Sequence, residues 1–162
     1  MTASVIAAAL VVLAVLALFA PRPKGSDSPP TAAPALSRSA ARYLAITGAA
    51  NHRLEIANDG YKKDELTKLA AAKADLRSEV ATETSFDEQL ARIPFPLSVA
   101  SIARALILAN EQRGALTARQ ARSTSLAQLR SFDVRHAATD AAVEVQVRLI
   151  RKALHLPPPT TS

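Results

Sequence analysis

Apolar residues recur at helical spacing from Leu36 onward, and this periodicity constrains the fold more than any other feature of the sequence. Residues that alternate steps of four and three positions lie on one face of a helix, which is the pattern of a helical bundle. We therefore predict a first helix from Leu36, ended near Asn58-Asp59-Gly60, where glycine and asparagine favour a helix terminus. Its inner face consists of Leu36, Ala40, Tyr43, Thr47, Ala50, Leu54, Ala57 and Tyr61.

A second helix is predicted from about Lys62 to Ile93, with glutamate and lysine on its outer face. Ser85 and Glu88 have the spacing of a capping box, so the helix either restarts near Thr84 or continues through it. Its inner face consists of Leu66, Leu69, Leu76, Val80, Phe86, Leu90 and Ile93.

The segment "IPFPL", residues 93–97, is the sharpest break in the sequence. Two prolines spaced two apart cannot continue a helix, and a short connection of this kind joins antiparallel helices. We expect Phe95 to close one end of the bundle, with an exposed recognition turn as the alternative. A third helix should follow from Leu97 to about Phe132, with possible interruptions at Gly114 or at Thr117/Gln120.

The last element, "AAVEVQVRLIRKALHL", fits two periods. Its valines alternate as in a strand, whereas Val143, Val147, Ile150 and Leu154 also share one face of a helix. We predict a helix, because no partner strand is visible elsewhere in the sequence. The prolines at 157–159 should end it.

The predicted fold class is therefore all-α, with an N-terminal transmembrane helix, a Pro/Ser-rich linker and an antiparallel four-helix bundle. We predict a transmembrane anchor or signal segment at 1–21, a disordered linker at 22–35, the helical bundle domain at 36–156 and a disordered tail at 157–162. The run from Val5 to Ala20 is apolar throughout. With the residues before it, it would span about 30 Å as a helix, the thickness of the hydrocarbon core of a bilayer.

Two questions follow from this apolar run: whether it is cleaved, and which side of the membrane the bundle occupies. Pro21 disfavours cleavage and no basic side chain precedes the run, so we expect an uncleaved anchor, with secretion after cleavage as the alternative. Arg22 and Lys24 favour a cytoplasmic bundle by the positive-inside rule. The Pro- and Ser-rich stretch 21–37 is typical of a stalk outside the membrane, and we expect an extracytoplasmic domain.

The net charge of +6 is concentrated in the last third of the chain, where residues 100–162 carry nine basic and four acidic side chains. Such a surface attracts anionic lipid or anionic envelope polymers. Nucleic acid is not expected as a partner, because tryptophan is absent, aromatics are few and no basic cluster marks a recognition helix.

The motifs of common enzymes are missing. The chain has no cysteine, no Gly-rich phosphate loop, no HExxH and no GxSxG, so we expect no enzymatic activity and no cofactor. His52 with Glu55, and Asp133, His136 and Asp140, have spacings that place them on common helix faces. Capping and solvent-facing roles are favoured for both groups over metal binding.

Several segments carry a resemblance to other proteins. They are "YLAI", "AN" and "LE" between Tyr43 and Glu55, "ADLRSE", "FDEQL" and "I-FP" between Ala74 and Pro96, "ALILANE", and the terminal "VRLIRKALHLPPP". Together they resemble uncharacterised secreted or membrane-anchored helical proteins of actinobacteria. The resemblance implies no activity, and it favours the extracytoplasmic placement.

The leading hypothesis is a membrane-anchored, extracytoplasmic interaction or binding module for a protein partner or an anionic envelope polymer, without catalysis. One alternative is a small-ligand-binding, sensor-like bundle with a pocket near Tyr43, Asn51 and Asn110. Another is a cytoplasmic-facing scaffold on an anionic membrane. Arg119, Arg122 and Arg130 complete the candidate ligand or partner surface.

Overall fold

The computed structural model of the 162-residue chain describes residues 11–12 and 32–161. Four long helices and one short helix account for most of the described residues. Their bounds are α1 (Ala32–Asp64), α2 (Leu69–Ala91), α3 (Leu97–Gln120), α4 (Leu126–Arg130) and α5 (Asp133–Ala153). Two short strands, β1 (Val11–Val12) and β2 (Thr160–Thr161), pair antiparallel, with Val11 opposite Thr161.

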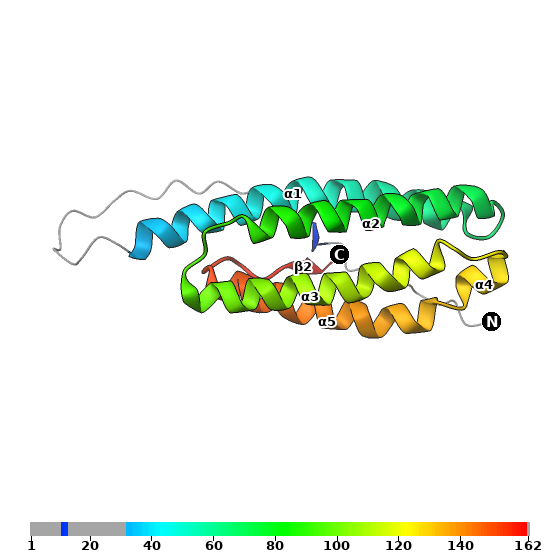
Figure 1. The fold of residues 1–162 in the computed structure, drawn as a ribbon. Coiled ribbons are helices and arrows are strands. Elements are labelled where there is room, and N and C mark those ends of the chain that lie inside the picture. The colour runs from blue at the N-terminus through cyan, green and yellow to red at the C-terminus, as the bar shows by residue number, and fades with distance from the viewer. Residues whose placement is uncertain (1–10, 13–31, 162) are drawn as a thin grey trace.

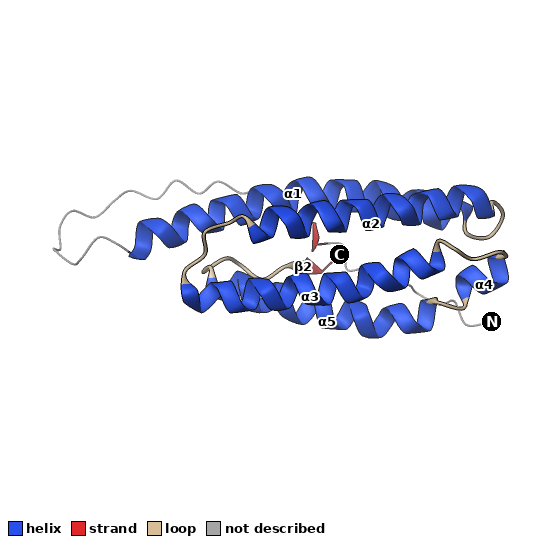
Figure 2. Cartoon of the chain, viewed as in Figure 1, coloured by secondary structure: helices blue, strands red, loops and turns tan. Residues whose placement is uncertain are grey.

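The four long helices pack as a bundle within residues 36–159, so the prediction of an all-α bundle is confirmed. Successive long helices run in opposite directions, and the α1–α2 hairpin lies against the α3–α5 hairpin (Figure 1). The helix backbones approach closely between α1 and α2, α2 and α3, and α3 and α5. The short α4 lies at the end of the bundle where the chain turns from α3 into α5 (Figure 2).

The predicted inner face of α1 is buried as expected, with Tyr43 almost fully enclosed. The predicted end at Asn58-Asp59-Gly60 is wrong, because α1 continues to Asp64. Gly60 does not mark a turn, and its lack of a side chain is explained by helix packing. A Cβ atom there would lie 2.7 Å from Oδ1 of Asp75 on α2, so glycine permits the close approach of the two helices.

The second helix begins later than predicted, at Leu69, and Leu66 lies exposed in the preceding connection. It continues through Thr84, whose hydroxyl donates to the backbone carbonyl of Val80 at 2.9 Å. The Gln89 side chain donates to both the carbonyl and the hydroxyl of Ser85, so these residues stabilise a continuous helix and do not cap a new one. Of the two possibilities left open at Thr84, the structure therefore selects the uninterrupted helix.

The break at residues 93–97 is confirmed, since α2 ends at Ala91 and α3 begins at Leu97. Phe95 is half-buried and packs against the core at this end of the bundle. Of the two possible interruptions of the third helix, the structure has the one at Thr117/Gln120: α3 continues through Gly114 and stops at Gln120, so an undivided helix to Phe132 is wrong. Ser125 then caps α4 by accepting a hydrogen bond from the backbone N–H of Gln128, which starts a separate short helix.

The last element is a helix, as predicted, and Ile150 and Leu154 are buried on its inner face. The chain leaves α5 through His155, which has a φ of 55°. The N–H of His155 donates to Lys152 O and that of Leu156 to Arg151 O, which are the two bonds of a Schellman motif. The chain thus begins to turn at His155, before the prolines.

The hydrophobic core has two parts. The larger cluster joins all four long helices towards the Phe95 end of the bundle and contains Ala40, Tyr43, Leu90, Ile93, Val99, Ala103, Leu106, Ile150 and Leu154. The smaller cluster lies towards the opposite end and contains Tyr61, Ala72, Leu76, Ala121 and Leu129. Between them the inner faces of α2, α3 and α5 carry charged side chains.

Within the part of the chain that the structure describes, no helix combines the length and the apolar character needed to cross a bilayer. Val11–Val12 are the described part of the predicted anchor at 1–21, and they form strand β1, not a helix. The rest of this segment lies outside the described residues. The same holds for most of the predicted linker at 22–35, of which α1 includes the last residues from Ala32.

Candidate functional site

Arg113 of α3 lies at the centre of the charged region, and its side chain is only 15% exposed. Its Nη2 pairs with Oε1 of Glu83 at 2.8 Å and also with Glu79, both on α2. Its Nε pairs with Oδ1 of Asp140 on α5 at 3.2 Å. One guanidinium therefore faces three carboxylates from two other helices.

Because three acidic side chains surround one arginine, one of the acids can stay protonated at neutral pH. Burial raises the pKa of Glu83 to about 8, against the opposing attraction of Arg113. Burial likewise raises the pKa of Asp140. Although burial acts on Arg113 in the opposite sense, the carboxylates around it raise its pKa, so it stays charged. The neutral group at pH 7 is Glu83, the most enclosed of the three acids.

Asp87 lies one turn further along α2 and is 9% exposed. Its Oδ1 accepts a hydrogen bond of 2.7 Å from the Asn110 side-chain amide on α3. Burial raises the pKa of Asp87 to about 6, and the bond from Asn110 acts in the opposite direction. Unlike Glu83, Asp87 is mainly ionised at neutral pH.

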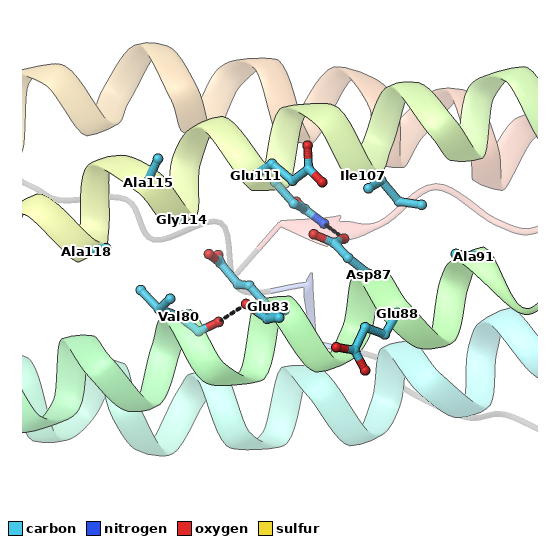
Figure 3. A pocket seen from close by; sticks show the side chains of 12 residues that line it. Val80, Glu83, Asp87, Glu88, Ala91, Ile107, Glu111, Gly114, Ala115 and Ala118 are labelled. Atoms are coloured by element: carbon cyan, nitrogen blue, oxygen red, sulfur yellow. Dashed lines mark hydrogen bonds between the residues drawn. The ribbon is translucent and has the colours of Figure 1, made fainter.

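A pocket of about 470 Å³ opens between α2 and α3 beside these groups (Figure 3). Glu83 and Asp87 form its buried part, whereas Glu88 and Glu111 are exposed at its rim. The rest of the wall is aliphatic or small and includes Val80, Ala91, Ile107, Gly114, Ala115 and Ala118. The volume lies within the range of about 300–1,000 Å³ that is usual for small-ligand sites.

A second, smaller cavity of about 70 Å³ lies on the other side of Glu83, where α1 faces α5. Glu83, Asn110 and Arg113 line it from α2 and α3. The two cavities share Glu83 and Asn110, so these two side chains lie between the smaller cavity and the larger pocket.

The structure brings three of the predicted site residues together. Tyr43, Asn51 and Asn110 all line the smaller cavity. Tyr43 is 1% exposed, and burial raises the pKa of its hydroxyl. Of these three residues, only Asn110 also lines the larger pocket. Tyr43 and Asn51 therefore belong to the smaller cavity alone.

The other predicted site residues lie elsewhere. Arg119 is in the last turn of α3, Arg122 follows that helix and Arg130 is in the last turn of α4. All three side chains are exposed, and none of them lines either cavity. Arg119 and Arg130 belong to helix ends at the end of the bundle where α4 lies (Figure 1).

The histidine and carboxylate spacings do not produce a cation site. His52 and Glu55 are both exposed on α1. His136 bonds to the Gln120 side chain at 2.9 Å, and Asp140 pairs with Arg113, so the two act in different networks. Among the described residues, no group of three or more His, Asp or Glu side chains is placed to hold a metal ion.

The sequence analysis missed Glu79, Glu83 and Asp87 as site residues, because it placed the glutamates on the outer face of α2 and assigned no face to Asp87. Their spacing of four positions puts them on a single face, between the buried residues Leu76 and Leu90. Three carboxylates that interrupt an apolar stripe were the available signal. Nothing in the sequence identified Arg113 among the basic residues as their partner.

The fold and the site together define the class of the protein: a four-helix bundle with a charged interior and an interhelical pocket. Comparison with protein-family models, with curated proteins and with solved structures gave no match.

Proposed function

We propose that this chain is a non-enzymatic binding module that takes up a small ligand in the pocket between α2 and α3. One observation carries the proposal: a pocket of ligand size ends at a buried carboxyl group with unused hydrogen-bonding capacity. Stable bundles rarely keep an incompletely partnered acid in the interior, because the acid costs stability unless it is hydrogen-bonded. A ligand that supplies the missing partner would offset this cost.

We also propose that the module is anchored in the membrane by residues 1–21 and lies on the extracytoplasmic side. The apolar run from Val5 to Ala20 and the Pro- and Ser-rich stretch after it support this placement. A tethered bundle with a pocket would then capture its ligand at the cell envelope.

Thermal denaturation of the full chain in an uncharged detergent tests ligand uptake. Against a panel of cationic, neutral and anionic small molecules, at least one compound should raise Tm by about 5 °C when present well above its Kd. Ala118→Leu fills part of the pocket wall and should abolish the shift, whereas Ala41→Leu on the exposed face of α1 should retain it. A panel without any shift, or a shift that Ala118→Leu leaves intact, contradicts the proposal.

Protease treatment of intact cells tests the placement. An extracytoplasmic bundle is degraded in intact cells, and a cytoplasmic control protein survives until lysis. If the bundle also survives until lysis, the orientation is reversed, and the basic last third of the chain would then face the anionic inner leaflet.

A second candidate function, capture of an anionic envelope polymer, is favoured by the exposed Arg119, Arg122 and Arg130. Inorganic polyphosphate is a suitable probe, and its binding should weaken steeply with salt. Changing these three arginines to glutamine should abolish binding. The matched triple change at Arg38, Arg42 and Arg53, which are exposed on α1, should not. If both triple variants lose the same amount of polyphosphate binding, binding depends on the net charge of the protein and not on these three arginines.

A further inference from the structure

The wall of the α2–α3 pocket has a charge opposite to that of the chain. The whole protein carries a net charge of +6. The residues that line this pocket nevertheless include four acids, Glu83, Asp87, Glu88 and Glu111, and no lysine or arginine. Two of these acids have arginine partners outside the wall, since Glu83 pairs with Arg113 and the exposed Glu88 pairs with Arg92 at 3.7 Å. A cation is therefore attracted locally to a molecule that repels cations overall.

Glu83 gives a second and independent indication. It is 5% exposed, and its carboxyl group extends from α2 towards Gly114 of α3 (Figure 3). A Cβ atom at Gly114 would lie 3.2 Å from Oε2 of Glu83, so the glycine leaves room for this oxygen. Arg113 pairs with Oε1, whereas Oε2 has no hydrogen-bond partner among the described residues.

The two levels of the pocket suggest the shape of the ligand. Glu83 and Asp87 lie at the buried end, and Glu88 and Glu111 lie at the rim. The rest of the wall is aliphatic or small, and Val80, Ala115 and Ala118 lie beyond Glu83, at the end of the pocket away from Glu88 and Glu111 (Figure 3). This arrangement matches an ammonium group on a short aliphatic chain, with the ammonium group at Glu83 and Asp87.

We propose that the α2–α3 pocket binds an organic ammonium compound, with an ammonium group at Glu83 and Asp87 and the aliphatic chain in the rest of the pocket. This assignment rests on the proposed ligand-binding function and names its chemical class. The ammonium group donates to the open oxygen of Glu83, which Arg113 leaves unused.

Binding to a neutral Glu83 releases a proton to solvent, since the acid becomes a carboxylate when it pairs with the ammonium. The charged groups that face Glu83 are Arg113 of α3, Asp140 of α5, and Glu79 and Asp87 of α2. Because burial raises the pKa of Glu83 to about 8, affinity should rise about tenfold between pH 6 and pH 7 and level off above pH 8.

Isothermal titration of the full chain in an uncharged detergent tests this inference, with 1,4-diaminobutane as the probe. The uncharged 1,4-butanediol, inorganic phosphate and Ca²⁺ serve as comparison ligands. Repeating the titration at pH 7 in buffers of different ionisation enthalpy should show about one proton released per diamine bound. Diol, phosphate and Ca²⁺ should not bind.

Three variants locate the site. Glu83→Gln keeps the side-chain volume and should weaken diamine binding at least tenfold while removing the proton release. Asp87→Asn keeps an oxygen that can accept from Asn110, and should weaken binding while proton release persists. Glu55→Gln, on the exposed face of α1, is the matched control and should bind as the unchanged chain does.

The outcomes separate the two proposals. Diamine binding lost in Glu83→Gln and kept in Glu55→Gln supports the assignment. Binding of diol, phosphate or Ca²⁺ in place of the diamine overturns the ammonium class and leaves ligand uptake standing if Ala118→Leu abolishes it. Diamine binding that is unchanged in Glu83→Gln also overturns the assignment. If none of these ligands binds and the broader thermal panel gives no shift, both proposals fail.

Discussion

The inner faces of α1 and α2 lie against each other, yet they stabilise the bundle by different means. The inner face of α1 is made of apolar and small residues, and Thr47 satisfies its hydroxyl within its own helix by donating to Tyr43 O. The inner face of α2 carries Glu79, Glu83 and Asp87 between apolar residues. Both faces are buried, but for different reasons. The inner face of α1 is buried because its apolar side chains pack, whereas packing alone does not explain the buried acids of α2.

The magnitudes favour a functional origin for the acids of α2. Burying an aliphatic side chain contributes about 1.5–3 kcal/mol to stability. Burying the neutral Glu83 carboxyl group without a full set of hydrogen-bond partners costs about 1–3 kcal/mol, and removing the ionised Asp87 from water costs several kcal/mol. Leucines at the positions of Glu83 and Asp87 would therefore give a more stable bundle, so we infer that the acids are kept for what they bind.

The largest expected effect comes from removing the counter-charge. Arg113→Met keeps much of the side-chain volume and leaves Glu79, Glu83 and Asp140 without their cation. We expect a loss of about 3–5 kcal/mol in the free energy of unfolding, measured by urea denaturation at pH 8. Arg104→Met, on the exposed face of α3, should change it by less than about 0.5 kcal/mol. If both variants lose the same free energy of unfolding, the charged cluster around Arg113 does not stabilise the bundle more than an exposed arginine does.

A pH series should give the next largest effect. In the unfolded chain Glu83 titrates near its ordinary pKa of 4.5, and in the folded chain near about 8. Between these values the folded state holds a proton that the unfolded state has lost. The stability from neutral Glu83 is therefore fully present below pH 4.5 and disappears as the pH rises through about 8.

We expect the free energy of unfolding to fall by about 2 kcal/mol between pH 6 and pH 8. Glu83→Gln should flatten the profile in this range, whereas Asp87, with a pKa of about 6, contributes mainly below it. The measurement is urea denaturation at half-unit pH steps. A profile that Glu83→Gln leaves unchanged would show that Glu83 is ionised in the folded protein.

Two glycine substitutions on α1 test whether close packing against α2 limits the size of the side chains on α1. Gly48→Ala adds a Cβ with nothing within 4 Å and should stabilise the helix by about 0.5–1 kcal/mol. Gly60→Ala has the same intrinsic gain but places its Cβ 2.7 Å from the Asp75 carboxylate, so the net effect should be neutral or destabilising. Thermal unfolding of both variants distinguishes them, and an equal gain in both would mean that Asp75 moves aside freely.

The smallest expected effect is at the end of α5. His155 holds a φ of 55°, which a residue with a Cβ adopts at some cost. His155→Gly should raise the free energy of unfolding by about 0.5–1 kcal/mol, since glycine is the usual residue at this position of a Schellman motif. Lower stability in urea would show that the imidazole makes a contact that outweighs the backbone strain.

Much of the fold could be predicted because it depends on local periodicity. The stripe that begins at Leu36 identified the inner face of α1, and the two prolines of residues 93–97 identified the turn before α3. Errors occurred where a residue with a strong local preference met a tertiary constraint. Gly60 resembled a helix terminus but serves a close helix contact, and the end of α3 depends on the buried Gln120, which donates to the Tyr61 hydroxyl and to Leu129 O.

The candidate site was less accessible to prediction. Tyr43, Asn51 and Asn110 were identified together because each interrupts or borders an apolar stripe, and they do line one cavity. Arg113 could not be selected among many basic residues, because its importance depends on two helices that are distant in the sequence.

The sequence by itself determined that residues after Leu36 form amphipathic helices separated by breaks at proline, because helical spacing and backbone restriction act over a few residues. Only the tertiary structure decided which polar residues face inward. The burial of Glu83, its raised pKa and its place at the end of a pocket arise from α2, α3 and α5 together. The environment of a charge is set by its neighbours in space, and a single helix does not contain them.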